Sequence, residues 1–289
     1  MSEFDASIDS LPRARIVTLT SDLGIDSLYL ASIKGAIISR DPSIRIVDIC
    51  HAIRPFDGVQ AAFSLRNTAA AFPPGTVHII SVNTMPTDGH VQRVMELGGQ
   101  FYIGMDDGIL SLIADKTPDA VYDITVQSES DCLTFPSLNV FVQVACHLIS
   151  GGVPAVIGRQ SGQLVEAHTP GATMGDDWIQ GIVEYVDNFG NLISNIDETS
   201  FRKAAKGRAF SIPLRTSRTK LTRIKKSYSD AGSEGERVIL FNHMGLLEIG
   251  IYKGGPDSGG GAAQLLGLGV GSRLRIEFSN PAEGADTLL

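Results

Sequence analysis

The chain has 289 residues, of which 43% are hydrophobic, and its formal net charge is −8. This length favours two domains, and the apolar content is enough to give each a core. The acidic balance argues against a general nucleic-acid-binding role, which relies on clustered Lys and Arg. One basic stretch, from Arg215 to Lys226, is the exception; it suits either an anion site or a solvated strand face.

The three cysteines, Cys50, Cys132 and Cys146, are far apart and form no CxxC pair. This spacing predicts neither a disulfide framework nor a zinc site, so we expect reduced core residues and no metal. The first eleven residues are acidic without an apolar run, unlike a signal peptide. No segment approaches the roughly 20 apolar residues of a membrane span. We therefore expect a cytoplasmic protein with no membrane partner.

The first half alternates short β-rich runs with stretches of helical spacing, which is typical of an α/β layered sheet. The predicted strands are Ile16 to Leu19, Arg45 to Ile49, Val77 to Val82, Phe101 to Gly104 and Ala120 to Ile124. The predicted helices between them are Tyr29 to Arg40, Gly58 to Ala71 and Val140 to Ile149.

From Gly151 to Asp177 the sequence is rich in Gly, Pro and Thr and loses the helical period, which favours a connector. The strand-like runs beyond it are Trp178 to Val186, Leu192 to Ile196, Ala209 to Ile212, Val238 to Phe241, Leu246 to Tyr252 and Ser272 to Phe278. These runs predict an all-β C-terminal barrel. We place the α/β domain at 14–165, the barrel at 176–280 and a flexible tail at 281–289.

The first candidate site is the turn from Thr20 to Gly24, where the apolar run Ile16 to Leu19 stops. An acid at the carboxyl end of a buried strand lies where open α/β sheets bind ligands. The carboxylate of Asp22 can accept hydrogen bonds from both hydroxyls of a ribose. The alternative is that Asp22 is an N-cap for a helix starting near Asp26.

The second candidate site is the run from Asp187 to Asn191, which combines an amide, an aromatic ring and a glycine. Asn191 offers donors and an acceptor to a heterocycle edge or a carboxylate, and Phe189 offers a ring face. The alternative is a tight turn, since Asp, Asn and Gly are the usual turn residues.

Six ordered segments resemble the S-adenosylmethionine (SAM) hydroxide adenosyltransferases and the related fluorinases and chlorinases. They are Thr20-Ser21-Asp22-Leu23-Gly24, Lys34-Gly35, Val47-Asp48-Ile49-Cys50-His51, Phe72-Pro73-Pro74-Gly75-Thr76-Val77, Asp106-Asp107-Gly108-Ile109-Leu110 and Asp187-Asn188-Phe189-Gly190-Asn191. The resemblance covers about Ile16 to Phe278. It implies an α/β domain followed by a β-barrel and a homotrimer. It also implies that SAM binds as a substrate or ligand between neighbouring subunits, without a further cofactor.

The resemblance also implies roles for individual residues in ligand binding. Asp22 matches the acid that holds the ribose hydroxyls, and Phe56 matches an aromatic residue beside the ribose. Asp187 and Asn191 match the polar pair that grips the methionine end and the adenine region, with Phe189 between them. Asn242 lies in a segment similar to the family's Asn-Ser-x-Gly in the adenine pocket, although His243 replaces the Ser.

The segments that organise the attacking water in the hydroxide enzymes differ here. Their Val-Asp-Pro-Gly-Val-Gly-Thr-x-Arg loop becomes Val82 to His90, so that Asn83 replaces the Asp and His90 the Arg. Their Phe-His-Gly-Arg-Asp segment becomes Phe135 to Asn139, where Pro136 replaces the His. Asn83 cannot act as a base, and Pro136 has no side-chain hydrogen-bonding group.

Two alternatives remain for the reacting centre. Asp88, His90 and Arg93 could rebuild an Asp, His and Arg set from one loop, or they could form an exposed turn. Ser137 lies where fluorinases keep a halide-contacting Ser, which gives Asn83, Asp88, His90 and Ser137 as the catalytic candidates.

We therefore expect the chain to cleave SAM with water to adenosine and methionine. The alternatives are an inactive adenosyl-nucleoside sensor and, third, a halogenase. An oligonucleotide-binding barrel that uses Arg215 to Lys226 ranks last, since it leaves the N-terminal domain without a role. The expected partners are SAM or adenosine, not nucleic acid.

Overall fold

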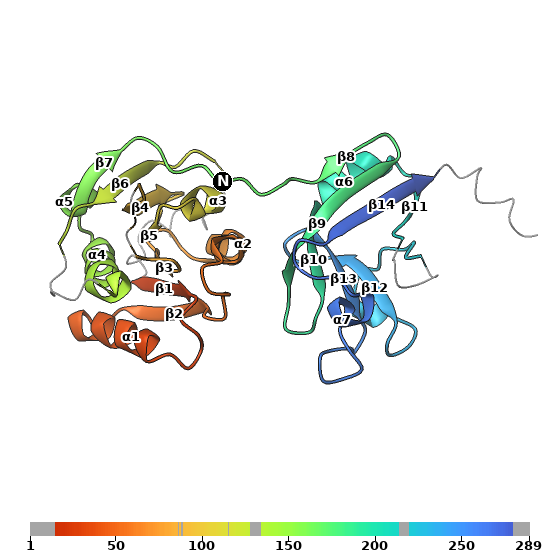
Figure 1. Ribbon diagram of the computed structural model, residues 1–289, viewed down its shortest axis with the longest axis horizontal. Coiled ribbons are helices and arrows are strands. Elements are labelled where there is room, and N and C mark those ends of the chain that lie inside the picture. Colours follow the sequence, from red (N-terminus) through yellow and green to blue (C-terminus); the bar gives the residue numbers. More distant parts are fainter. Residues whose placement is uncertain are drawn as a thin grey trace, which may run out of the picture. The chain divides into compact units, whose positions relative to one another are not determined.

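The computed structural model describes residues 15–85, 87, 89–114, 116–127, 134–213 and 220–279. The chain divides into two compact units, Met1–Thr169 and Pro170–Leu289 (Figure 1). Each unit has a seven-stranded sheet of its own.

The first unit is built on a mixed sheet with the strand order β2-β1-β3-β5-β4-β6-β7. Its strands are β1 (Ile16–Ser21), β2 (Arg45–Cys50), β3 (Val77–Ser81), β4 (Gln92–Leu97), β5 (Gln100–Met105), β6 (Ala120–Ile124) and β7 (Gly158–Ser161). Strands β2, β1, β3 and β5 run parallel, whereas β4, β6 and β7 each pair antiparallel with the strand before them in this order. The carboxyl ends of β1, β2 and β3 therefore meet at one edge.

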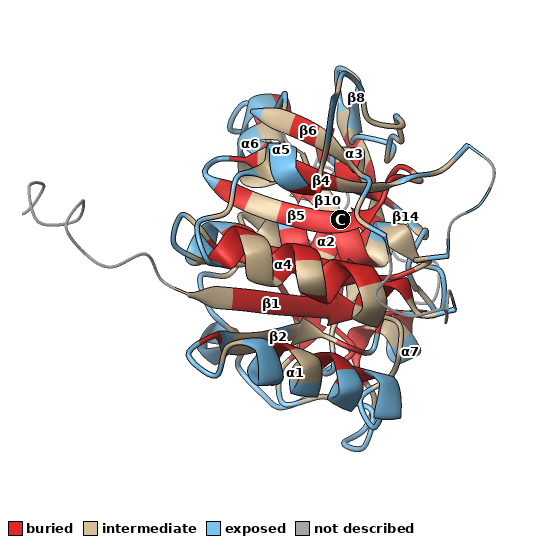
Figure 2. Cartoon of the chain, turned by 90° about the vertical axis from the view of Figure 1, so that its left-hand side faces the viewer, coloured by how far each residue is buried: buried red, intermediate tan, exposed pale blue. Residues whose placement is uncertain are grey.

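Helices cover both faces of this sheet. They are α1 (Leu28–Arg40), α2 (Gly58–Thr68), the 3₁₀ turn η1 (Ala69–Ala71), α3 (Ile109–Ile113), the π-helical turn η2 (Ser137–Phe141), α4 (Val142–Ile149) and α5 (Pro154–Ile157). One apolar cluster joins α1 and α4 to one face through residues such as Leu19, Ile33 and Phe141 (Figure 2). A second cluster joins α2 and α3 to the other face, around Leu65 and Ile80.

The five strands and three helices predicted for this unit are confirmed, with shifts of a few residues at their ends. Strands β4 and β7 were not predicted. The interpretation of 151–177 as a connector is wrong for its first part, because α5 and β7 lie there and β7 pairs with β6. A four-residue edge strand such as Gly158–Ser161 has little apolar alternation to reveal it.

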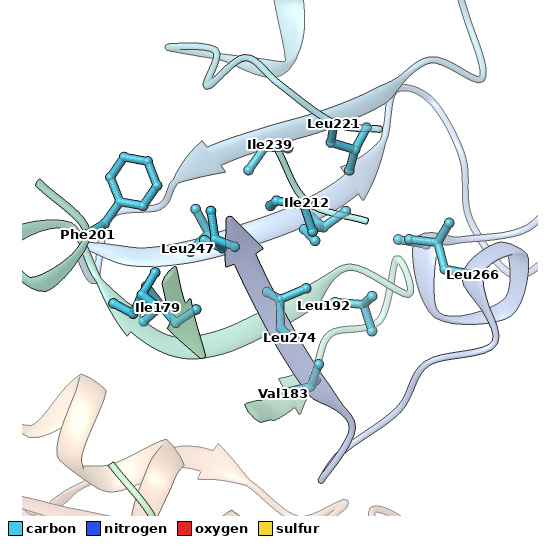
Figure 3. Close-up of a cluster of buried hydrophobic side chains, with 14 of the residues drawn as sticks. Ile179, Val183, Leu192, Phe201, Ile212, Leu221, Ile239, Leu247, Leu266 and Leu274 are labelled. Atoms are coloured by element: carbon cyan, nitrogen blue, oxygen red, sulfur yellow. The ribbon is translucent and has the colours of Figure 1, made fainter. Parts of the chain in front are cut away.

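The second unit is a curled, mainly antiparallel sheet with the strand order β11-β14-β9-β10-β13-β12, and β8 pairs with β9. Its strands are β8 (Thr173–Met174), β9 (Trp178–Val186), β10 (Leu192–Asp197), β11 (Ala209–Ser211), β12 (Arg237–Phe241), β13 (Leu246–Ile251) and β14 (Arg273–Ser279). Its helices are α6 (Glu198–Ala205), the 3₁₀ turn η3 (Tyr228–Asp230) and α7 (Ala262–Leu266). Branched aliphatic side chains fill the concave side, as Figure 3 shows.

The expectation of an all-β closed barrel is met only in part. The sheet path ends at β11 and β12, and these two strands do not pair with each other. Isolated bridges link the intervening segment to both sides, with Leu221 opposite Ile212 and Ile224 opposite Ile239. The unit is also not all-β. Asp197 caps α6 by accepting a hydrogen bond from Ser200 N, and Phe201 packs α6 into the core.

None of the helices in the described ranges is long and apolar enough to cross a membrane. Cys50 and Cys146 are free thiols with intermediate burial, and Cys132 lies outside the residues that the structure describes.

A buried polar group sits at the start of β3 in the first unit. The side chain of His78 is fully buried, with Nδ1 2.7 Å from Thr18 Oγ1 and Nε2 3.3 Å from Gln100 Oε1. The imidazole stacks on the ring of Tyr102, with the ring centroids 4.6 Å apart. Burial lowers the pKa of His78 from 6.5 to about 4, although the contact with Gln100 acts in the opposite direction.

His78 predicts a loss of stability at acid pH. The unfolded chain takes up a proton below pH 6.5, whereas the folded chain does so only near pH 4, so stability falls as the pH drops through this window. The loss from this one group is at most about 1.4 kcal/mol per pH unit. Urea unfolding at pH 7, 6 and 5 should show the decline, and His78→Gln should flatten it. Equal slopes in the two proteins would contradict the assignment.

Candidate substrate-binding and catalytic site

The carboxyl ends of β1 and β3 form the centre of the candidate site in the first unit. Ser21 lies opposite Ser81 in the parallel register, and Asp22 N donates to the Ser81 carbonyl oxygen at 3.4 Å. Open α/β sheets bind ligands at this edge. The position of Asp22 therefore agrees with its predicted location at the end of a buried strand.

The carboxylate of Asp22 is held by the segment that follows β2. Phe56 N donates to Asp22 Oδ2 at 2.9 Å. Phe56 adopts a left-handed backbone with φ of 65°, and its side chain is 75% exposed. A bulky residue with positive φ is strained, and such strain concentrates at functional sites. The alternative role of Asp22 as a helix cap does not apply, because Ser27 caps α1 by accepting from Leu30 N.

A buried histidine adjoins Ser21. His51 Nδ1 lies 2.7 Å from Ser21 Oγ, and Nε2 lies 3.1 Å from Asp48 Oδ1. The His51 carbonyl oxygen also accepts from Gly24 N at 3.1 Å. The register between β1 and β2 shifts after Leu19, as in a β-bulge. Bulges re-aim side chains beside active sites, and here the shift accompanies the contact between Ser21 and His51.

A pair of serines continues this polar group. Ser81 Oγ and Ser137 Oγ are 2.5 Å apart, and both residues are buried. Ser137 opens the π-helical turn η2, and π-bulges occur often at functional sites. The catalytic candidate Ser137 thus lies beside the carboxyl end of β3.

Asn83 follows β3 and is tied to the loop after β5. Its Nδ2 donates to Asp107 Oδ2 at 2.7 Å, and its φ is 48°. Asp107 Oδ1 also accepts from Ile109 N at 3.3 Å. Because the Asn83 amide faces a carboxylate acceptor, it acts as a hydrogen-bond donor at this position.

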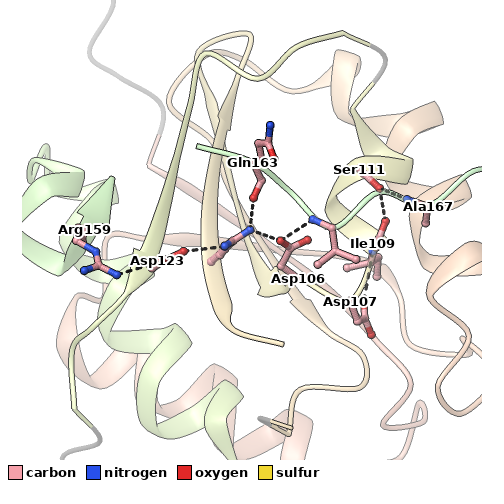
Figure 4. Close-up of polar contacts among 11 residues, drawn as sticks. Asp106, Asp107, Ile109, Ser111, Asp123, Arg159, Gln163 and Ala167 are labelled. Carbon is pink, nitrogen blue, oxygen red and sulfur yellow. Dashed lines mark hydrogen bonds and ion pairs between the residues drawn. The ribbon is translucent and has the colours of Figure 1, made fainter. Parts of the chain in front are cut away.

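Arg93 anchors the loop that carries Asp106 and Asp107, which are both labelled in Figure 4. It lies in β4, and its guanidinium makes an ion pair with the buried Asp106 and donates to Asp123 Oδ1 at 2.7 Å. Asp106 Oδ2 also accepts from Val165 N at 2.9 Å. Burial raises the pKa of Asp106, although the contacts from Val165 and Arg93 lower it. The network fastens residues 163–167 to the sheet.

The Asp88, His90 and Arg93 set is not brought together in the described residues. His90 Nδ1 lies 3.2 Å from Thr87 Oγ1 in an exposed contact, and Arg93 is engaged in the ion pairs with Asp106 and Asp123. Asp88 lies outside the described residues.

The second unit brings Asp187, Phe189 and Asn191 together in one turn. Asp187 Oδ1 accepts from Phe189 N at 2.9 Å and from Asn191 N at 2.8 Å, and Oδ2 accepts from Asn191 Nδ2 at 2.9 Å. The tight turn expected as an alternative is therefore present. The same residues also line a cavity of about 430 Å³ together with Tyr228 and Glu248. The ring of Phe189 is 63% exposed.

Asn242 reaches this cavity indirectly. Its Nδ2 donates to Glu248 Oε2 at 3.0 Å, and Tyr228 Oη donates to Glu248 Oε1 at 2.5 Å. Burial, reinforced by the Glu248 and Asp187 carboxylates, raises the pKa of Tyr228 well above its usual range. Tyr228 therefore remains a neutral donor at physiological pH.

Two other features bear on the predicted partners. A larger cavity of about 1050 Å³ in the second unit is lined by part of the basic stretch, including Lys220 and Arg223, but Arg215 and Arg218 lie outside the described residues. Lys225 there makes an ion pair with Glu236. In the described part of the chain, no group of three or more His, Cys, Asp or Glu side chains is arranged to hold a metal ion.

Several residues of the site were not singled out from the sequence. In the sequence, Asp48 and His51 belong only to a family-like segment, Ser21 lies in the turn predicted after Leu19, and Ser81 lies inside the strand predicted to end at Val82. Glu248 and Tyr228 carried no local signal, because they meet only through the pairing of β13 with its neighbours. A titratable residue directly after a predicted strand, such as His51, is a signal that the sequence offers.

The fold and these sites define a two-domain protein with a polar cluster at the edge of an α/β sheet and an aromatic, amide-lined cavity in a curled β-sheet. Its sequence matches the SAM hydroxide adenosyltransferase N-terminal domain over residues 17–158 and the C-terminal domain of the same family over residues 181–275. The chain belongs to the SAM hydroxide adenosyltransferase family.

Individual relatives agree with this assignment. The chain is 28% identical over 247 residues to the (R)-S-adenosyl-L-methionine hydrolase of Methanocaldococcus jannaschii, covering 81% of this chain and 87% of that protein. It is 26% identical to the fluorinase of Nocardia brasiliensis, covering 82% and 90%. The crystal structure of an uncharacterized conserved protein from Thermotoga maritima superposes with a TM-score of 0.80 at 25% identity, covering 90% and 99%.

The contact between Asn83 and Asp107 predicts how stability changes when Asn83 is replaced by Asp, the residue expected from the family resemblance. Asn83→Asp replaces a 2.7 Å hydrogen bond with two facing carboxylates, so the variant should lose about 2 kcal/mol of stability at pH 7. Part of this loss should return at pH 5, where one carboxyl group binds a proton. The swapped variant, Asn83→Asp with Asp107→Asn, rebuilds the donor–acceptor pair and should recover stability in thermal unfolding. If the swap is no more stable than Asn83→Asp, the pair is not the cause.

A side chain added at Gly250 would test whether the cavity in the second unit binds the ligand. A Cβ at this position would lie 2.1 Å from Tyr228 Oη and 2.4 Å from Asn191 Oδ1. Gly250→Ala should displace both groups and weaken SAM binding at least tenfold by calorimetry. Gly269→Ala is the matched control, because a Cβ there meets no atom within 4 Å. Unchanged binding by Gly250→Ala would show that this cavity is not used.

Proposed function

We propose that the protein hydrolyses SAM at the ribose C5′ carbon to give adenosine and methionine. The family and the relatives named (R)-S-adenosyl-L-methionine hydrolase support this reaction. The observation that carries it is the position of Asp22. Its carboxylate uses one of about four lone-pair positions to accept from Phe56 N, which leaves acceptor capacity for a ribose diol.

The reaction needs little activation of the substrate. The water oxygen forms a bond to C5′ as the bond from C5′ to sulfur breaks, and methionine leaves as a neutral thioether. One proton is released from the water. The protein must therefore hold the nucleoside and the water in line, exclude bulk solvent and accept that proton.

The binding roles are divided between the two units. In the first unit Asp22 holds the ribose and the exposed Phe56 ring lies against it. In the second unit Asp187, Phe189 and Asn191 take the adenine and methionine groups in the cavity, and Asn242 supports it through Glu248. We propose that a homotrimer completes the site, with the first unit of one subunit and the second unit of its neighbour. The assembly is cytoplasmic and needs no cofactor.

The proposed reacting centre lies around Ser137 and Asn83. Ser137 supplies a buried hydroxyl, and Asn83 orders the loop through Asp107. Asp88 and His90 remain predicted catalytic residues of the loop after β3. They have no role in the ribose binding proposed here.

The direct test is incubation of the purified protein with each sulfonium epimer of SAM. Adenosine and methionine are followed by chromatography with and without chloride or fluoride. We expect adenosine from the (R) form that gives the relatives their name, independent of halide. The lack of any nucleoside product under all these conditions would overturn the enzymatic proposal.

A second candidate function rests on Asn83 and Pro136, which replace an Asp and a His that the resemblance to the hydroxide enzymes leads us to expect. In that case the protein binds an adenosyl nucleoside without turnover. Calorimetric binding of SAM with no product over days would favour this function. A 5′-halogenated nucleoside formed only with halide would instead indicate a halogenase that uses Ser137.

Asp22→Ala tests the ribose anchor. The variant removes the acceptor that faces the Phe56 amide, so SAM affinity should fall by about 100-fold or more, the loss of two charge-assisted hydrogen bonds. Asp26→Ala removes an exposed acid four residues away and is the matched control. Calorimetry with both variants measures the difference. Equal affinities would place the ribose elsewhere.

A further inference from the structure

We propose that His51 accepts the proton released by the attacking water, acting through the hydroxyl of Ser21, while Asp48 holds its other ring nitrogen. This inference rests on the proposed function, because hydrolysis of SAM by water must release a proton. It assigns a role to three residues of the first unit that the binding site leaves unused.

The three side chains lie in series, with a close Ser21–His51 contact and a His51–Asp48 approach in which Nε2 does not yet make a hydrogen bond. Ser21 Oγ lies 2.7 Å from His51 Nδ1, and His51 Nε2 lies 3.1 Å from Asp48 Oδ1. Ser21 and His51 are buried, whereas the Asp48 side chain is 45% exposed. The series of side chains therefore leads from the buried edge of the sheet to the protein surface.

The tautomer of a neutral His51 follows from its two neighbours. An ionised carboxylate can only accept hydrogen bonds, so a ring nitrogen 3.1 Å from Asp48 is the one that should carry the proton in the relay. Nδ1 then has a free lone pair, and the Ser21 hydroxyl must donate to it. Serine, histidine and aspartate take these same roles where a histidine withdraws a proton from a hydroxyl group.

The charges around His51 keep Asp48 ionised. Burial acts to raise the pKa of Asp48, but contacts with Lys34 and His51 outweigh burial and hold this pKa below its usual range. Lys34, which lies in α1, donates from Nζ to Asp48 Oδ2 at 2.6 Å. Asp22, the next residue after Ser21, is a further acid at this edge, and its carboxylate accepts a hydrogen bond from the Phe56 amide.

Ser21 also adjoins the proposed reacting centre. It lies opposite Ser81 in the parallel register, on the same face of the sheet, and Ser81 Oγ contacts Ser137 Oγ. Neighbouring strands are about 4.8 Å apart, so one water can contact the hydroxyls of both strand ends. A water held there is within reach of the relay and of Ser137.

The proton transfer balances in one step. The water oxygen bonds to C5′ and the bond from C5′ to sulfur breaks, with the electron pair leaving on methionine. The water proton passes to Ser21 Oγ as the Ser21 proton passes to His51 Nδ1. His51 becomes an imidazolium that Asp48 stabilises, and it returns its proton to solvent.

Other acids and bases near this edge are already engaged. Asp107 accepts from Asn83, and Asp106 is buried against Arg93. His90 is in an exposed contact with Thr87. His51 is the histidine in contact with a hydroxyl at the carboxyl end of β1.

Ser21→Ala, His51→Gln and the double variant test whether these residues act as one unit. Each single change should lower kcat by about 100-fold, the low end for a general base, with KM unchanged. The double variant should lose no more than either single variant, because residues that act together are not additive. Losses that multiply in the double variant, or normal rates in either single variant, would overturn the relay.

The pH profile separates a chemical role from a structural one. In the wild type kcat should fall toward acid pH, because protonated His51 has no lone pair for Ser21. In His51→Gln this acid limb should disappear. His168→Gln, which changes an exposed histidine in the segment after β7, is the matched control and should keep the wild-type profile. An acid limb that persists in His51→Gln would overturn the proposal.

The position of the proton on His51 can be measured in the wild-type protein without turnover, so this test does not depend on whether the variants fold. ¹⁵N NMR of labelled histidine should show His51 with its proton on Nε2, and Asp48→Asn should change this signal. A proton on Nδ1 would overturn the assignment. If the wild type gives no adenosine, the proposed function fails and the relay with it; if the wild type turns over and the variants match it, only the relay fails.

Discussion

The parallel pairing of β1 with β3 and with β2 is the constraint on which the first-unit site depends. It places Ser21 opposite Ser81 and brings the residues that follow β2 beside the turn at Asp22. The register shift after Leu19 accompanies the contact between His51 and Ser21. A change of this register by one residue would place the side chains of Ser21 and Ser81 on opposite faces of the sheet.

The polar side chains at this edge are of two kinds. Some hold a loop in place by pairing with each other, and others can still accept hydrogen bonds from a ligand. Arg93 and Asp106 neutralise each other in the interior, which suits a buried ion pair whose role is to anchor a loop. Asn83 and Asp107 similarly satisfy each other. Asp22 differs, because a single backbone amide occupies only part of its acceptor capacity. This spare capacity, on a residue at the carboxyl end of β1, supports the ligand-binding role proposed for Asp22.

The sequence predicted the elements whose signals are local. The apolar runs Ile16 to Leu19 and Val77 to Val82 predicted the central strands, and the turn residues indicated Asp22 and Asp187. Strands β4, β7 and β8 and helices α3, α5, α6 and α7 are not predicted. All of these except β4, α6 and α7 have five residues or fewer or lie in the segment interpreted as a connector, α6 and α7 lie in a region predicted to be all-β, and β4 starts in a loop with no long apolar run. The contacts of His51 with Ser21, and of Glu248 with Tyr228, join residues 20 or more positions apart, so they depend on strand pairing that local patterns do not specify.

The presence of Asn83 and Pro136 where the family resemblance leads us to expect an Asp and a His does not by itself remove hydrolysis. The sulfonium leaves as a neutral thioether, so water at the right distance from C5′ needs positioning more than strong deprotonation. The charge change along the reaction is the loss of the sulfonium charge and the release of one proton. A neutral histidine behind a serine hydroxyl can accept that proton without placing a second carboxylate next to Asp22. A relay through Ser21 and His51 is therefore compatible with Asn83 acting only as a donor to Asp107.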